Sequence, residues 1–170
     1  KYMLKEELQS VGLVISFLKS QGYEATSSDK GGNTSFLHYD VICKKEGQED
    51  RFIEVKRRRF TVSNFLRYSK EGFIYENTKY QFLKDKFGFY MNVINLNGID
   101  YIFSWYVGIN TSLRFRWEGK SCRATTDFDN NNYVEKLVSY VYPANAQIIK
   151  CENGEFSPIK YDDLIKNLKQ

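Results

Sequence analysis

The sequence predicts an α/β fold, with one mixed sheet and helices packed against it. Three observations favour this class. They are a helical repeat of apolar residues near the N-terminus, two β-rich runs joined by a polar turn around Gly47, and two further β-rich runs joined by Asn97-Gly98. In order, these elements predict a helix, three strands, a helix and two strands. At 170 residues, the chain is long enough for one domain with a substantial core.

The first helix is expected over residues 2–20, with Gly22 at its C-terminal cap. Its apolar residues recur at helical spacing: Leu4, Leu8, Val11, Val14, Ile15 and Leu18. On a helical wheel, Glu7 lies within this apolar stripe and Glu6 lies outside it. Because a carboxylate on an apolar face is costly unless it is paired or binds a metal, Glu7 is a candidate site residue. The alternative is a glutamate near the helix end whose side chain reaches solvent.

A β-hairpin is expected next, after a short first strand over residues 23–27. Its two strands lie near 36–44 and 51–58, where β-branched and aromatic residues are frequent. The segment between them is polar and contains Gly47, as a short hairpin loop requires.

The register of this hairpin is set by its turn. Antiparallel partners have residue numbers with a constant sum, so a turn centred on Gly47 puts Asp40 directly opposite Glu54. Side chains alternate along a strand, so Lys56 lies on the same face as Glu54. The remaining cross-strand pairs match well in this register: Ile42 with Phe52, and Lys44 with Asp50. The opposite face is apolar and is expected to be buried: Val41, Cys43, Ile53 and Val55.

This placement of charge indicates a metal site. Two carboxylates that face each other across a sheet repel and destabilise it, and a divalent cation is the simplest compensation. Lys56, two residues after Glu54, can contact the same bound water or a phosphate. Asp40, Glu54 and Lys56 together therefore predict a metal-dependent phosphodiesterase site. The alternative is an ordinary hairpin with solvated charges on its outer face.

The rest of the chain predicts further helices and strands. Ser63 or Asn64 is expected to cap a helical region that runs to about residue 86, with a break at Gly72. The later strands are expected over 88–96, 99–107, 113–117 and 147–151, and the later helices over 133–142 and 161–168. Because no repeat or linker is evident, residues 1–170 are expected to form a single domain, with a core over about 2–107 and a C-terminal elaboration over about 108–170.

The charge distribution favours an anionic partner. The chain carries a formal net charge of +4, with basic residues concentrated just after Glu54 in the run Lys56-Arg57-Arg58-Arg59. Basic runs of this kind often contact phosphate backbones. A later stretch interleaves basic and aromatic residues, as nucleic-acid surfaces do, although its aromatic residues would serve equally well in a core: Arg114, Phe115, Arg116, Trp117, Lys120 and Arg123.

The cysteines have no paired spacing, which predicts reduced thiols: Cys43, Cys122 and Cys151. No apolar run is long enough for a membrane-spanning helix, and the start of the chain has no signal-peptide pattern. A cytoplasmic protein is therefore expected.

The order of elements and the acidic residues resemble the PD-(D/E)xK nuclease superfamily. The matching residues are Asp40 within His38-Tyr39-Asp40-Val41-Ile42, and Glu54 with Lys56 within Phe52-Ile53-Glu54-Val55-Lys56. Tyr39 stands in place of the proline that names the motif. The resemblance covers about residues 2–107 and implies a restriction-endonuclease-like fold, with an αβββαβ core and a mixed sheet.

The resemblance implies a metal-dependent endonuclease that hydrolyses phosphodiester bonds of DNA. Asp40, Glu54 and the carbonyl of Val55 would bind Mg2+ or Mn2+, and Glu7 would bind a second metal ion or a metal-bound water. Lys56 would orient or deprotonate the attacking water.

Nucleic acid would be contacted by a further set of residues: Arg57, Arg58, Arg59, His38 and Gln81, the last with Lys79. Of the three arginines, Arg58 shares the face of Lys56. For His38 a structural role is the alternative, and for Gln81 and Lys79 a solvated helix face. DNA is the expected partner, RNA is an alternative, and many members of this fold act as homodimers. A non-catalytic nucleic-acid-binding module on the same fold is the alternative function, and an unrelated α/β protein is a third.

Overall fold

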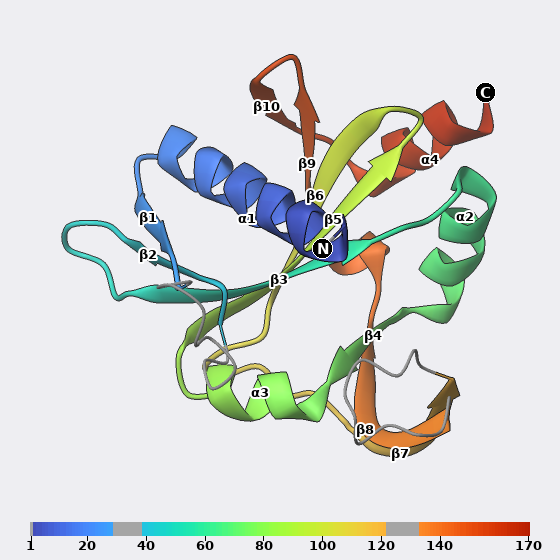
Figure 1. Cartoon of the computed structure of the whole chain (residues 1–170), viewed down its shortest axis with the longest axis horizontal. Coiled ribbons are helices and arrows are strands. Elements are labelled where there is room, and N and C mark those ends of the chain that lie inside the picture. The colour runs from blue at the N-terminus through green and yellow to red at the C-terminus, as the bar shows by residue number, and fades with distance from the viewer. Residues whose placement is uncertain (1, 29–38, 122–132) are drawn as a thin grey trace.

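The predicted mixed α/β class is confirmed by a computed structural model, which describes residues 2–28, 39–121 and 133–170 (Figure 1). The helices are α1 (Tyr2–Ser20), α2 (Val62–Glu71), α3 (Asn77–Leu83) and α4 (Tyr161–Lys169), with a short 3-10 helix at Pro143–Asn145. The first five strands are β1 (Glu24–Ser27), β2 (Val41–Lys44), β3 (Arg51–Arg58), β4 (Phe73–Glu76) and β5 (Phe87–Leu96). The later strands are β6 (Ile99–Tyr106), β7 (Arg116–Ser121), β8 (Tyr133–Val141), β9 (Gln147–Glu152) and β10 (Glu155–Pro158).

A central sheet of seven strands has the order β1-β2-β3-β5-β6-β9-β10. Strands β3 and β5 are parallel, and every other neighbouring pair is antiparallel. A parallel pair needs a crossover connection, and here the crossover contains α2, β4 and α3. Strand β4 leaves the central sheet and pairs with β8 in a second sheet of order β4-β8-β7.

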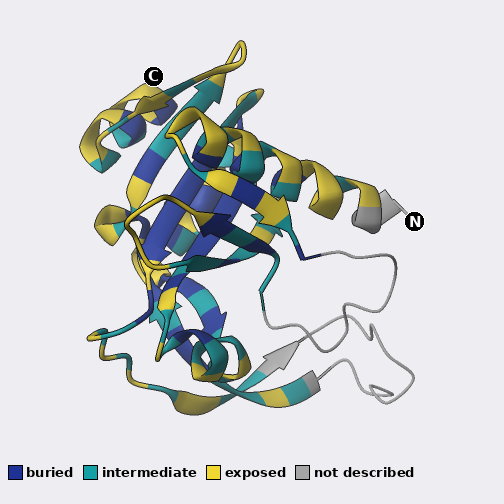
Figure 2. Cartoon of the chain, turned by 90° about the vertical axis from the view of Figure 1, so that its left-hand side faces the viewer, coloured by how far each residue is buried: buried dark blue, intermediate teal, exposed yellow. Residues whose placement is uncertain are grey.

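The central sheet is covered on both faces. Helix α1 packs on one face, where Val14 and Leu18 meet Val41, Cys43 and Ile53. The other face is packed by α2, α4 and the second sheet, through a larger and more aromatic cluster: Phe65, Phe73, Tyr75, Leu83, Tyr90, Phe103, Trp105 and Leu164. The middle strands are therefore buried along most of their length (Figure 2).

The predicted register of the β2–β3 hairpin is confirmed. Val41 pairs with Ile53 and Ile42 pairs with Phe52, so the residue numbers of each pair have the same sum as those of Asp40 and Glu54. Beyond the ladder, Lys44 and Asp50 form an exposed ion pair with an N–O distance of 3.7 Å. Three residues of the predicted apolar face are fully buried, and the fourth is half-buried: Val41, Cys43 and Ile53, then Val55.

The predicted hairpin turn between β5 and β6 is also confirmed. Asn97 and Gly98 both have positive φ, at 54° and 83°, which a two-residue type I′ turn requires. The same dipeptide chemistry recurs at Asn153-Gly154, with φ of 54° and 75°, and joins β9 to β10. Sequence reasoning missed this second turn and therefore missed β10.

The predicted apolar stripe of α1 is confirmed for Val11, Val14, Ile15 and Leu18, which pack against the sheet, and is wrong at Glu7 and Leu8. The buried positions of the helix are Ser10, Val14 and Leu18, a row with a spacing of four residues. Leu8 is 50% exposed. Extending the buried row towards the N-terminus reaches Glu6, which is half-buried and forms an ion pair with Arg59.

Glu7 is exposed, so its predicted place on the apolar face is wrong. The physical reason is that Ser10, although polar, takes the central buried position. Its hydroxyl donates to the backbone oxygen of Glu6 at 3.0 Å and accepts from Arg57 at 3.3 Å.

The helical region after β3 divides as predicted at Gly72, whose φ is 92°. The predicted cap, Ser63 or Asn64, is wrong. The N-terminal cap of α2 is Thr61, whose hydroxyl accepts from the backbone N–H of Asn64 at 3.1 Å. Strand β4 and then the short helix α3 come after Gly72, in place of the expected continuation of the helix. Strand β4 is explained by its pattern of burial: Phe73 and Tyr75 lie on one face of the strand, and their rings join the aromatic core.

In the C-terminal third, the predicted helix over 133–142 is wrong, because this segment is strand β8. Its pairing with both β4 and β7 satisfies its backbone groups. The strand predicted at 113–117 is displaced to β7, whereas the predicted strand β9 and helix α4 are confirmed. Among the residues that the structure describes, no helix is long and apolar enough to cross a membrane.

The described cysteines are free thiols. Cys43 is fully buried, as predicted from its place on the hairpin, and Cys151 is half-buried. Burial raises the pKa of each thiol to about 11. Cys122 lies outside the described residues.

Candidate active site

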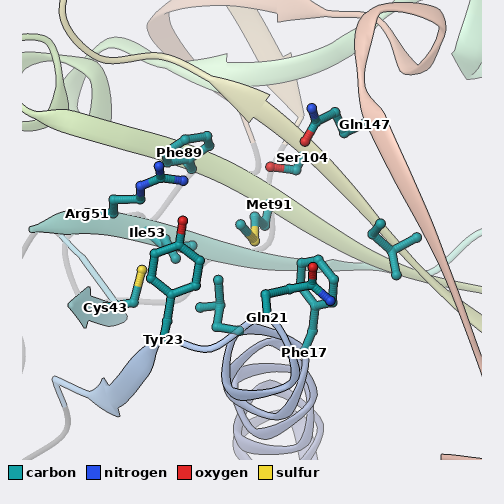
Figure 3. Close-up of a pocket in the computed structure, with 12 residues that line it drawn as sticks. Phe17, Gln21, Tyr23, Cys43, Arg51, Ile53, Phe89, Met91, Ser104 and Gln147 are labelled. Carbon is teal, nitrogen blue, oxygen red and sulfur yellow. The ribbon is translucent and has the colours of Figure 1, made fainter. Parts of the chain in front are cut away.

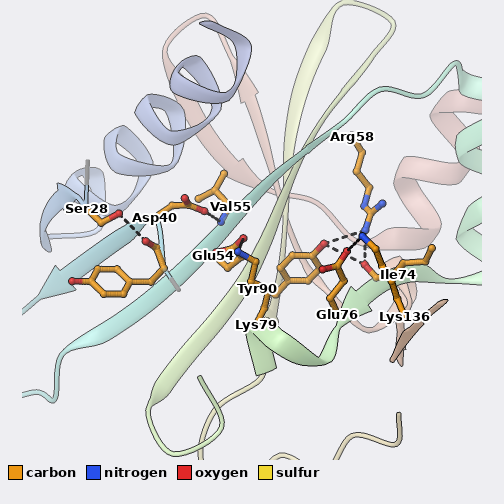
Figure 4. A network of polar contacts seen from close by, with 11 residues as sticks. Ser28, Asp40, Glu54, Val55, Arg58, Ile74, Glu76, Lys79, Tyr90 and Lys136 are labelled. Atoms are coloured by element: carbon orange, nitrogen blue, oxygen red, sulfur yellow. Dashed lines mark hydrogen bonds and ion pairs between the residues drawn. The ribbon is translucent and has the colours of Figure 1, made fainter. Parts of the chain in front are cut away.

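Asp40 lies at the point where β2 begins to pair with β3. Its backbone N–H donates to the carbonyl of Ile53 at 2.8 Å, and its carbonyl accepts from the N–H of Ser28 at 2.9 Å. The carboxylate then turns towards β3, where Oδ2 accepts from the N–H of Val55 at 2.8 Å (Figure 4). Two of these hydrogen bonds fix Asp40 against the middle of β3, and the third connects it to Ser28, just after β1.

Tyr39, which stands where the motif has proline, packs against aromatic residues beside the site. Its ring lies edge-on to Phe52 of β3, with centroids 5.2 Å apart, and stacks on Phe82 of α3 at 5.7 Å. These contacts connect the start of β2 with α3. Helix α3 is thereby held next to Asp40 and Glu54.

Asp40 and Glu54 face each other, as predicted, because the β2–β3 register places them opposite one another. On its other side, Glu54 Oε1 lies 3.2 Å from the Nζ of Lys79 on α3. The Glu54 side chain is only 12% exposed. We call Asp40 and Glu54 the carboxylate pair.

Burial and then the nearby charge of Asp40 raise the pKa of Glu54 to about 8, while Lys79 acts in the opposite direction. Even with Lys79 beside it, a second negative charge on the carboxylate pair is therefore disfavoured. A site of this kind favours either a proton or a cation.

Lys56 lies on the same face of β3 as Glu54, as predicted from strand alternation, and it is exposed at its outer end. Burial of the remainder and the charge of Arg58 lower its pKa, while Glu76 and Glu54 act in the opposite direction. Lys136 also lowers it, and forms an ion pair with Glu76 at 2.9 Å. The amine of Lys56 is therefore closer to deprotonation than that of an ordinary lysine.

Arg58 shares the face of Lys56 but is used inside the fold. Its Nε donates to Oδ1 of Asn92 at 2.5 Å, and its Nη2 donates to the carbonyl of Ile74 at 2.7 Å and to the hydroxyl of Tyr90 at 3.0 Å (Figure 4). The guanidinium also lies over the ring of Phe73, 5.1 Å from its centroid. Arg58 therefore connects β3, β4 and β5.

The other two arginines of the basic run point to the α1 face of the sheet. Arg57 donates to Ser10 and lies 3.8 Å from Asp100, and Arg59 pairs with Glu6. Alternation along the strand explains this division, because odd-numbered positions of β3 face α1 and even-numbered positions face the carboxylate pair. The structure thus does not bring Arg57 or Arg59 to the face of Glu54.

Two further predicted residues lie away from the carboxylate pair. Glu7 is exposed on α1, which covers the opposite face of the sheet, and Gln81 is exposed on α3. Lys79, two residues before Gln81, is the residue of α3 that contacts Glu54. His38 lies outside the described residues.

Asn92, which sequence reasoning missed, lies beneath this network. It is completely buried, and its Nδ2 has no hydrogen-bond partner among the described residues; the same holds for the hydroxyl of Tyr75. The asparagine within the apolar run 89–94 of β5 was the signal, because a buried amide in a strand needs a partner. Lys56 pairs with Asn92 across the β3–β5 ladder, so this amide lies directly under the site.

A separate cavity of about 190 Å³ opens on the α1 face of the sheet (Figure 3). Its floor includes Cys43, Ile53 and Met91, and the guanidinium of Arg51 lies over the rings of Tyr23 and Phe89. None of its lining residues is acidic. The sheet separates this cavity from the carboxylate pair.

The residues present fit a hard divalent cation. Among residues 2–28, 39–121 and 133–170, no group of three or more His, Cys, Asp or Glu side chains is placed to hold a metal ion. Mg2+, however, is commonly bound through one or two carboxylates while it keeps several waters. Asp40 and Glu54, which lie opposite each other, match that mode of binding.

Comparisons with known proteins give few similarities. No protein-family model matches the chain, and no curated protein matches its sequence significantly. Among solved structures, the chain is similar to that of Hjc, a Holliday junction resolvase from the archaeal hyperthermophile Archaeoglobus fulgidus. The sequence identity is 14% and the TM-score 0.33, and the match covers 59% of this chain and 76% of that chain. At this level of similarity, the residues of the chain itself must indicate its chemistry.

Proposed function

We propose that this protein is a metal-dependent endonuclease that hydrolyses phosphodiester bonds of DNA. The observation that carries the proposal is the carboxylate pair, held face to face with Lys56 on the same side of the sheet. Two half-buried carboxyl groups that face each other repel and destabilise a fold, and groups with such perturbed pKa values concentrate at functional sites. A divalent cation would remove the repulsion.

Asp40 and Glu54 would hold Mg2+ or Mn2+, together with the carbonyl of Val55. The N–H of Val55 points to Asp40. In a strand, the N–H and C=O of one residue point to the same neighbour, so the carbonyl lies on the Asp40 side as well. When bound, the cation supplies charge neutralisation at the scissile phosphate and lowers the pKa of a coordinated water.

Lys56 would accept a proton from the attacking water or hold that water in line with the phosphate. Its lowered pKa supports this role, because a general base must be partly deprotonated near the working pH. Lys79 would neutralise Glu54 before the cation binds, and would then be near enough to contact the phosphate. Glu7, Gln81, Arg57 and Arg59 are not placed to take part in these steps.

DNA is the proposed partner, with the net charge of +4 in its favour. A homodimer would place two carboxylate pairs on one substrate, and RNA remains the alternative substrate to be tested beside DNA.

A non-catalytic nucleic-acid-binding module is the second candidate, and one observation favours it. The ion pair of Lys79 with Glu54 already supplies one positive charge to the site. In a binding module, this lysine would take the place of a metal ion permanently, and cleavage would be absent under all conditions.

A cleavage assay separates these candidates. We expect wild-type protein to cut at least one of supercoiled plasmid, linear duplex, single-stranded DNA and RNA with Mg2+ or Mn2+, and to cut none in EDTA. Lys56→Ala should lower the rate by about 100-fold, in line with the loss of a general base. Lys166→Ala on α4 is a matched control, because Lys166 is exposed and distant in sequence from the site. Binding without cleavage of any substrate would favour the module and contradict the nuclease.

A further inference from the structure

A groove of about 600 Å³ lies between the end of β3, helix α2 and strand β8, within the size range of ligand pockets. It is lined by Arg58, Arg59, Phe60, Asn64, Tyr68, Glu71, Gly72, Phe73, Ile74, Arg116, Tyr140 and Tyr142. We call this the arginine–tyrosine groove. Neither Asp40, Glu54 nor Lys56 lines it, so it is distinct from the carboxylate pair.

Aromatic rings form much of its surface. Tyr68 stacks on Phe60, with centroids 5.4 Å apart and planes 22° from parallel. Tyr142 is 39% exposed, which is high for so large a side chain. Gly72 allows this arrangement, because a Cβ there would lie 2.9 Å from Cβ of Tyr140 and 3.1 Å from the ring of Tyr142. Because Gly72 has no side chain, Tyr140 of β8 and Tyr142, just after β8, can pack against the end of α2.

Positive charge is interleaved with these rings. Three arginines and one glutamate, Glu71, line the groove, but Arg58 is hydrogen-bonded within the fold and Arg59 pairs with Glu6. Arg116 is therefore the arginine that a ligand would meet. Its guanidinium is exposed, lies over the ring of Tyr140 at 5.6 Å from its centroid, and pairs with Glu118. Arg58 closes the inner end.

The groove continues the line of the carboxylate pair along β3. Arg58 is four residues after Glu54 on the same face of the strand, which corresponds to about 13 Å. In Figure 4, Asp40 and Glu54 lie on one side of Tyr90, and Arg58 and Ile74 lie on its other side. A polymer that crosses the carboxylate pair along this strand would therefore reach the groove within a few residues of its length.

We propose that the arginine–tyrosine groove binds unpaired nucleotides of the nucleic acid that the carboxylate pair cuts. The proposal rests on the nuclease function above and deepens it by specifying the substrate class, a strand with an unpaired segment. Aromatic faces accept any base by stacking, and arginines beside them contact the phosphates. A duplex hides its base faces within the stack, so it would leave the tyrosines unused.

The test measures binding in EDTA, so that no cleavage occurs. Fluorescence anisotropy would compare a labelled single strand of about 12 nucleotides, the blunt duplex of the same sequence, and a fork that joins that duplex to an unpaired arm. The variants are Tyr142→Leu, which keeps an apolar side chain beside Gly72, and Arg116→Gln. Tyr106→Leu is a matched control because Tyr106 is also 39% exposed, and Lys166→Gln is the control for charge.

We expect the single strand and the fork to bind more tightly than the duplex. Tyr142→Leu should weaken binding of the single strand about tenfold, and Arg116→Gln should reduce the dependence of log K on log salt by about 1. Both controls should bind as the wild type does. Equal loss of duplex and single-strand binding in Tyr142→Leu would overturn the proposal, as would competition by polyglutamate equal to that by the single strand.

Failure of this proposal and failure of the nuclease function give different results. If metal-dependent cleavage is present but Tyr142→Leu and Arg116→Gln bind every substrate as the wild type does, the groove proposal is wrong and the nuclease stands. If those variants lose the single strand selectively while no substrate is cut, the groove proposal is supported and the nuclease is contradicted.

Discussion

Glu54→Gln is expected to make the metal-free protein more stable at pH 8 and to lower metal-dependent cleavage by more than about 100-fold. The two effects have one cause. Burial and the charge of Asp40 raise the pKa of Glu54 to about 8, so ionisation of this carboxyl opposes folding when no cation is present. Glutamine keeps the size and hydrogen-bonding capacity of the side chain but carries no charge for a cation to bind.

The pH dependence is determined by the direction of this pKa shift. A carboxyl whose pKa is higher in the folded state than in the unfolded state stabilises the fold fully below its unfolded pKa, and this contribution is lost as the pH rises through the folded pKa. For Glu54, the window runs from the ordinary value of 4.5 to about 8. The thermal midpoint of the metal-free wild type should therefore fall by several degrees relative to Glu54→Gln across that window.

Glu76→Gln is the matched control for this experiment. Glu76 lies on the neighbouring strand β4 and pairs with Lys136, but its side chain is 39% exposed. Its replacement should leave the pH dependence of the thermal midpoint close to that of the wild type. If the thermal midpoints of the wild type and Glu54→Gln depend on pH in the same way, repulsion within the carboxylate pair does not destabilise the fold.

Arg58→Ala is expected to lower the free energy of unfolding by about 3 kcal/mol or more. The substitution removes three hydrogen bonds and leaves the buried Oδ1 of Asn92 without its donor. It also removes the contact with the ring of Phe73. For a chain of this size, the thermal midpoint should fall by about 10 °C.

Arg59→Ala serves as the control for Arg58→Ala, because it removes the same side chain from the next position. Arg59 is 53% exposed and pairs with Glu6, so its loss should cost less than about 1 kcal/mol. Thermal or urea unfolding of the metal-free proteins measures both values. An Arg58→Ala variant as stable as wild type, with uniformly weaker DNA binding, would return Arg58 to the phosphate-binding role that the sequence predicted.

The hairpin that carries the carboxylate pair was predictable from the sequence because its information is local. The polar turn around Gly47 and the alternation on both sides of it determine the register. A shift of one residue would bury Asp40, so the pattern allows one solution. Lys56 is on the predicted face for the same reason.

The error at α1 shows a limit of apolar periodicity. The wheel was centred on leucine and valine, whereas the structure buries Ser10 between Glu6 and Val14. Nothing local indicates that Ser10 would accept a hydrogen bond from Arg57, 47 residues away. Glu7 was therefore assigned to the buried face of α1, next to which Glu6 lies in the structure.

Strands β4 and β8 were missed because each depends on the other. Segment 133–141 is rich in valine and tyrosine, as strands are, but it does not alternate, and its partner β4 had been assigned to a helical region with a break at Gly72. The contact of Lys79 with Glu54 depends on this same rearrangement, since β4 ends directly before α3. Long-range pairing of this kind is not contained in local propensity.

Titration of the metal-free protein with Mn2+ at pH 8, followed by calorimetry, tests the central claim most directly. We predict saturable binding of at least one cation per chain, lost in Asp40→Asn and retained in Asp50→Asn, whose carboxylate lies on the exposed turn and pairs with Lys44. Each bound cation should also displace protons below pH 8, so affinity should increase with pH. The absence of saturable binding at millimolar Mn2+, or binding that survives Asp40→Asn unchanged, would contradict a metal site at the carboxylate pair.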